Sequence, residues 1–121
     1  MINHGKEESD ALKIISSTIS NCEKAQLKFA AGTSQHSLLK NRIKALYISQ
    51  AVISNDGSIK TYTGEELSKA LPPVISIISK TEKAQSKYEK ESAQYRRFEP
   101  IIKAMRISES LIKEELCKRE L

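Results

Sequence analysis

The block Glu23-Lys24-Ala25-Gln26 returns 59 residues later as Glu82-Lys83-Ala84-Gln85. Working outward from this block, residues 5–53 align with residues 64–112 without a gap, and 20 of the 49 aligned pairs are identical. Shared helical composition alone rarely produces a gapless match of this length. The sequence therefore predicts a tandem duplication that organises most of the chain.

Each half of the alignment contains two stripes of apolar residues spaced by three and four positions, the pattern of an amphipathic helix. The stripes run from Leu12 to Phe29, from Leu39 to Ile53, from Leu67 to Tyr88 and from Phe98 to Ile112. We therefore expect an all-α, four-helix bundle made of two duplicated helical hairpins with approximate internal twofold symmetry. The alternative is a domain-swapped or face-to-face dimer of open hairpin pairs.

The length of 121 residues fits one hydrophobic core. We expect residues 1–121 to form a single helical domain. Its parts would be a first repeat at 5–53, a connector at 54–63, a second repeat at 64–112 and a C-terminal helix end at 113–121.

Turn residues separate the predicted helices of the first half. Gly32 suits the left-handed position after a helix end, and Thr33 or Ser34 suits the next N-cap. The run Asn55-Asp56-Gly57-Ser58 is a strong stop and turn signal. The following residues 59–62 form a short connector that could lie extended.

The second half opens with Thr63 and Glu66 at the spacing of a capping box. Prolines then mark the main departures from the first half. Pro72 and Pro73 predict that the third helix is kinked or restarts near Leu71, because a proline inside a helix costs about 3 kcal/mol.

The third proline lies in the second helix of this half. Pro100 predicts that the fourth helix starts near Glu99, with the proline in its first turn, where the missing N–H costs least.

The net charge is +5, with 20 basic and 15 acidic residues. By the expected symmetry, basic residues of the second and fourth helices could form one surface that contacts a phosphate backbone. These residues are Lys40, Arg42, Lys44, Arg96, Arg97, Lys103 and Arg106. The plainer interpretation is a solvated face balanced by acids one helical turn away.

Gln26 and Gln85 fall on the apolar stripes of the first and third helices. One hypothesis is a polar pair that binds a ligand at the bundle axis. The favoured hypothesis is a core pair of buried amides that form hydrogen bonds across helices and fix their register.

The sequence lacks the residue patterns that catalysis or metal binding would require. Neither histidine, His4 or His36, has a glutamate three residues before it, as a di-iron bundle would require. Cys22 falls on an apolar stripe and is expected in the core. We therefore expect no metal, no cofactor and no enzymatic activity.

The favoured hypothesis for function is a non-catalytic protein–protein interaction module in the cytoplasm. Its partner would be a protein, a homodimer is an open alternative, and an exposed apolar patch would include Leu38, Tyr47 or Ile101. The alternative is a nucleic-acid-associated regulator that binds nucleic acid weakly through the basic surface. No apolar run is long enough for a membrane helix. A Cys22–Cys117 disulfide could form, although reduced thiols are favoured.

Overall fold

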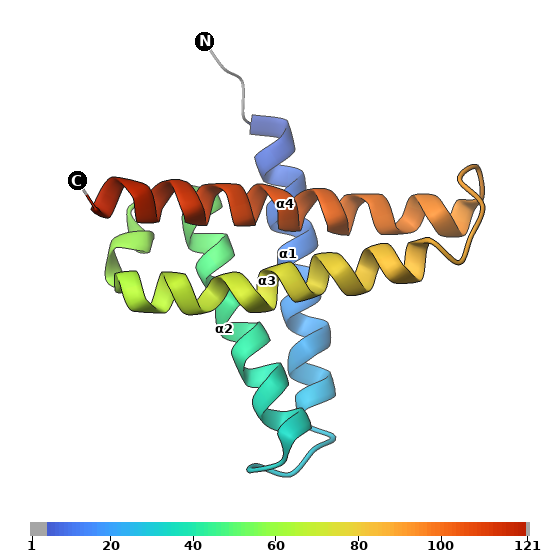
Figure 1. The fold of residues 1–121 in the computed structure, drawn as a ribbon, viewed down its shortest axis with the longest axis horizontal. Coiled ribbons are helices and arrows are strands. Elements are labelled where there is room, and N and C mark those ends of the chain that lie inside the picture. The colour runs from blue at the N-terminus through green and yellow to red at the C-terminus, as the bar shows by residue number, and fades with distance from the viewer. Residues whose placement is uncertain (1–4, 121) are drawn as a thin grey trace.

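The computed structural model describes residues 5–120, which form four α-helices and one short 3-10 helix and contain no strand (Figure 1). In chain order the elements are α1 Gly5–Gln26, α2 Ser34–Ser54, η1 Ser58–Thr61, α3 Gly64–Gln85 and α4 Ala93–Arg119. The prediction of an all-α chain with four helices is confirmed.

Two helical hairpins, α1–α2 and α3–α4, pack across one another (Figure 1). Helix α2 contacts both α3 and α4, and α1 contacts α4, so every helix has partners in both hairpins. The hairpin tips point away from the crossing in different directions. The interior of the bundle therefore lies where the two hairpins cross.

The core collects the apolar stripes of all four helices. The largest fully buried apolar side chains are Ile15, Leu46, Ile48, Ile53, Leu67, Val74, Met105 and Ile112. Burying a side chain of this size contributes about 1.5–3 kcal/mol. Small residues are also buried on every helix, namely Ala11, Ala45, Ala70 and Ala104, and they allow helix backbones to approach closely.

The predicted turns of the first half are present. Gly32 has a φ of +93°, and the Thr33 hydroxyl caps α2 by accepting from the His36 N–H. Asn55 ends α2 in the left-handed conformation, and Gly57 follows with a φ of +92°. Left-handed backbone of this kind favours glycine and asparagine, which explains these residues at these places.

The capping box at the start of α3 is also confirmed. The Thr63 hydroxyl accepts from the Glu66 N–H at 3.0 Å, and the Glu66 carboxylate accepts from the Thr63 N–H at 2.9 Å. Two N–H groups that a helix start leaves unpaired are thereby satisfied.

Helix α3 runs without interruption from Gly64 to Gln85, so the predicted restart near Leu71 is wrong. Pro72 is exposed and Pro73 is half-buried, while Val74 beside them is fully buried. Packing of the buried face on both sides of the prolines holds the helix together and offsets the lost backbone hydrogen bonds.

Helix α4 begins at Ala93, not near Glu99, so that prediction is also wrong. The hydroxyl of Ser92 accepts from the Tyr95 N–H and caps the helix start, which places Pro100 inside the helix. The connector differs as well. Residues 58–61 form the 3-10 helix η1 and are not extended, because carbonyls three residues back accept from the N–H groups of Lys60 and Tyr62.

Candidate functional site

A groove of about 660 Å³ runs between α2 and α3. Helix α2 supplies one wall and α3 the other. The α2 wall consists of Leu38, Asn41, Arg42, Lys44, Ala45 and Ile48. The α3 wall consists of Glu65, Glu66, Lys69, Ala70, Pro72, Pro73 and Ser76. We call this feature the α2–α3 groove.

Apolar side chains form much of this groove. Ala45, Ile48 and Ala70 belong to the core and make its floor. Leu38 stays 49% exposed at its edge. Large apolar side chains at the rim of a hollow are characteristic of a surface that another molecule covers.

The prolines also change the backbone of the α3 wall. Since Pro72 and Pro73 have no N–H, they cannot give the carbonyls of Ser68 and Lys69 their usual helical hydrogen bonds. The carbonyls of Ser68 and Lys69 therefore lack their usual backbone donors on α3, the helix that forms one wall of the groove.

An ion pair joins the two walls of the groove. Lys44 Nζ lies 2.7 Å from Glu66 Oε2 and joins α2 to the first turn of α3. Hydrogen bonds from Lys44 and from the Thr63 backbone hold the pKa of Glu66 below its ordinary value. Lys69 and Glu65 add one further charge of each sign to the α3 wall.

Arg42 is the most unusual residue of the α2–α3 groove. It is half-buried, and its Nε and Nη2 atoms are buried without a hydrogen-bond partner among residues 5–120. Burial raises the pKa of the nearby Cys22 thiol, and the Arg42 cation acts in the opposite direction. Arg42 thus lies between the groove and the α1 helix, with two donors unsatisfied.

Beside a hollow of about 560 Å³ between α1 and α4 lies a smaller groove, of about 280 Å³, between the same helices. Eight of its nine lining residues are 59 positions away from residues of the α2–α3 groove. These eight are Glu7, Asp10, Ala11, Ile14, Pro100, Lys103, Ala104 and Ile107. Its charge differs, because one cation and three acids line it, against three cations and two acids in the α2–α3 groove.

The two grooves differ at the positions that give the larger one its character. Arg42 corresponds to Ile101, Lys69 to Asp10 and Pro73 to Ile14. Sequence reasoning singled out Arg42 only as part of a basic surface and overlooked the groove. The alignment of residues 5–53 with residues 64–112 contains a signal for it, because it marks the positions at which the two segments differ.

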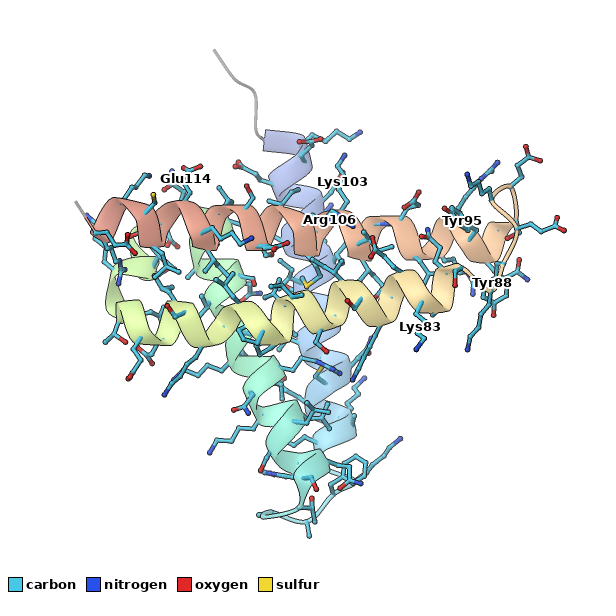
Figure 2. The ribbon with its side chains drawn as sticks, in the orientation of Figure 1. Lys83, Tyr88, Tyr95, Lys103, Arg106 and Glu114 are labelled. Atoms are coloured by element: carbon cyan, nitrogen blue, oxygen red, sulfur yellow. The ribbon has the colours of Figure 1, made fainter. Side chains whose placement is uncertain are left out.

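Three of the seven basic residues predicted as a surface have carboxylate partners. Lys44 pairs with Glu66, Lys103 pairs with Glu7 at 2.9 Å, and Arg106 pairs with Glu82. Lys44 lies at the α2–α3 contact, whereas Figure 2 shows Lys103 where α4 crosses α1. Each pair reduces the positive charge available to a phosphate backbone.

The other predicted basic residues are dispersed. Lys40 is exposed on α2, and Arg96 and Arg97 are exposed near the start of α4. These two arginines follow Tyr95, which lies toward the tip of the α3–α4 hairpin (Figure 2). Arg42, the fourth, belongs to the groove described above.

Gln26 and Gln85 each form a hydrogen bond within their own hairpin. The Gln85 amide donates to the Tyr95 carbonyl at 3.1 Å, and the Gln26 amide donates to the His36 carbonyl at 3.4 Å. Each glutamine is the last residue of its helix, so the two lie at separate hairpin tips (Figure 1). Both bonds join the end of one helix to the first turn of the next.

Residues 5–120 show neither a metal-binding cluster nor a membrane-spanning helix. In that range, no group of three or more His, Cys, Asp and Glu side chains is arranged to hold a metal ion. His4 lies outside the described residues. None of the described helices combines the length and the apolar character needed to cross a bilayer.

Comparisons with protein-family models, with curated proteins and with solved structures give no match to this chain.

Proposed function

We propose that this chain is a non-catalytic protein–protein interaction module that holds a helix of a partner protein in the α2–α3 groove. The main support for this proposal is the groove itself. It has an apolar floor and an exposed leucine at its edge, and two helices flank it as an amphipathic helix requires. We rank nucleic-acid binding below this function because Lys44, Lys103 and Arg106 already have carboxylate partners.

We also propose that the fold arose by tandem duplication and keeps an approximate twofold axis. Helices α1 and α3 both contain 22 residues and begin 59 positions apart. Equivalent contacts recur at the same offset, and they include Gln26–His36 with Gln85–Tyr95, Tyr47–Glu23 with Arg106–Glu82, and Lys44–Glu66 with Lys103–Glu7. The last two pairs exchange hairpins, as a twofold axis requires.

A cytoplasmic location is part of the same proposal. Cys22 is buried and Cys117 is exposed, and both are free thiols, which supports a reducing compartment.

The docking proposal can be tested with a yeast-displayed library of amphipathic helical peptides about five turns long, sorted against the purified protein. The affinities of the enriched peptides are then measured for the unaltered protein and for the Leu38→Arg variant. This variant puts an arginine at the edge of the groove, which is the residue type found 59 positions later, at Arg97. We expect at least tenfold weaker binding, because the charged side chain cannot desolvate against an apolar helix.

The matched control is Tyr47→Arg. Tyr47 is an exposed apolar residue outside the groove, and its hydroxyl donates to Glu23. Arginine at this position can pair with Glu23, as Arg106 pairs with Glu82 at the equivalent place. Binding unchanged in Tyr47→Arg and lost in Leu38→Arg supports the proposal. No enriched peptide, or equal binding to Leu38→Arg and the unaltered protein, overturns it.

A further inference from the structure

We infer that the helix held in the α2–α3 groove carries an acidic side chain within its apolar stripe, and that this carboxylate pairs with Arg42. The inference rests on the proposed function and defines the chemistry of the partner. It starts from the two buried donors of Arg42, Nε and Nη2, which have no partner among residues 5–120.

These two donors lie on one edge of the guanidinium plane. The N–H of Nε and one N–H of Nη2 point in the same direction, and together they match the two oxygens of a carboxylate. A buried charged donor without a partner costs more free energy than a neutral one, so the site favours an incoming anion. Both atoms are shielded in the structure, so the guanidinium edge must turn toward a bound helix for this pair to form.

Among residues 5–120, neither Nε nor Nη2 of Arg42 has a carboxylate partner, although two glutamates line the same groove. Glu66 is engaged by Lys44 and by the capping box, and Glu65 next to it is exposed on the first turn of α3. Lys69 adds a second cation on the opposite wall. Local charge thus favours a partner with an acidic group over a partner with a basic one.

The α1–α4 groove has the opposite chemistry. Ile101, the equivalent of Arg42, does not line it, and Asp10 stands in the place of Lys69. Glu7 is engaged there by Lys103, as Glu66 is by Lys44, but an acidic helix would meet repulsion from Asp10 and Glu99. The inferred partner therefore distinguishes between two grooves built from equivalent positions.

The test uses a neutral amphipathic peptide of about five helical turns and a scan that places a single Glu, Gln or Lys at each position of its apolar stripe. Affinities are measured by isothermal titration calorimetry for the unaltered protein, Arg42→Ile and Arg97→Leu. Both variants remove one positive charge and insert the residue of the equivalent position. Only the first removes the proposed partner of the carboxylate.

At one position of the scan, we expect Glu to bind the unaltered protein about tenfold more tightly than Gln, as expected for a charge-assisted hydrogen-bonded pair. Arg42→Ile should abolish this preference, and Arg97→Leu should retain it. If Glu and Gln peptides bind equally at every position, the carboxylate inference is overturned while groove docking stands. If no peptide of the series binds the unaltered protein, the docking proposal fails together with the inference.

Discussion

Lys44 Nζ lies 2.7 Å from Glu66 Oε2, and this contact ties the middle of α2 to the first turn of α3. Glu66 also accepts from the Thr63 N–H in the capping box, so one carboxylate serves both the start of a helix and the junction between the hairpins. The contact joins the two walls of the α2–α3 groove. Its state of charge therefore matters for the stability of the fold.

We predict that Glu66→Gln destabilises the protein at pH 7 and that the effect vanishes in acid. Hydrogen bonds from Lys44 and the Thr63 backbone lower the pKa of Glu66 from 4.5. A carboxyl group with a lowered pKa in the folded state contributes stability that is present above 4.5 and is lost as the pH falls through the lowered value. Urea unfolding at pH 7 and at successively lower pH measures the difference.

Glu65→Gln is the matched control, because Glu65 lies beside Glu66 in the same first turn but outside the capping box. The control should show a smaller difference at pH 7. An equal destabilisation by Glu66→Gln at every pH would contradict the assigned role of its charge.

Gln85 should matter more than Gln26 for stability. Gln85 is 7% exposed and its amide donates at 3.1 Å, whereas Gln26 is half-buried and donates at 3.4 Å. We expect Gln85→Ala to cost about 2 kcal/mol and Gln26→Ala about 1 kcal/mol in free energy of unfolding. Chemical denaturation of both variants checks the order, and the reverse order would refute it.

The sequence predicted those features that depend on local spacing. The apolar stripes indicated four helices, and Thr33, Asn55 and the Thr63–Glu66 pair indicated their boundaries. The sequence also contains a signal for the start of α4. Ser92 stands 59 residues after Thr33 and caps α4 as Thr33 caps α2. The rule that a proline inside a helix is costly points instead to a start near Glu99, and α4 does not follow that rule.

The candidate groove could not be predicted in the same way. It depends on how two hairpins cross, and no short-range pattern specifies that crossing. The unsatisfied donors of Arg42 appear only when its surroundings are complete, because burial and hydrogen bonding are properties of the packed structure. Likewise, α3 continues through Pro72 and Pro73 because of tertiary packing, which local propensity does not contain.

Arg119 should hold the C-terminal end of α4 against the connector. Its Nη1 and Nη2 atoms donate to the carbonyls of Tyr62 and Ile59 at 2.6 and 2.9 Å, and its Nε lies 3.0 Å from Glu115. We expect Arg119→Met to cost about 1.5 kcal/mol and to speed amide exchange in η1. Lys118→Met is the control, since Lys118 pairs only loosely with Glu114 at 3.8 Å. Unchanged exchange in Arg119→Met would exclude the proposed role.

Arg42→Ile should leave the protein at least as stable as before. The substitution removes two buried donors that lack partners and inserts the apolar residue found at the equivalent position, Ile101. Since an unsatisfied buried donor costs about 1–3 kcal/mol, we expect the free energy of unfolding to rise by about 1 kcal/mol. Arg42 would then lower the stability of the free protein while being needed for partner binding, as residues at functional sites often do. A decrease of about 1 kcal/mol or more in the free energy of unfolding would instead show that Arg42 stabilises the fold.

The same substitution should shift the titration of Cys22. Burial raises the pKa of this thiol, and the Arg42 cation opposes that shift by favouring the thiolate. Without the cation, the pKa of Cys22 should rise further, so that the midpoint of thiol alkylation moves to higher pH. The measurement uses a Cys117→Ser background, because Cys117 is exposed and would react first. Lys40→Ala removes a cation from the same helix and should leave the midpoint unchanged. If the midpoint pH of alkylation stays constant or falls in Arg42→Ile, the placement of Arg42 beside Cys22 is contradicted. A change in the alkylation rate at a constant midpoint would report only a change in access to the thiol.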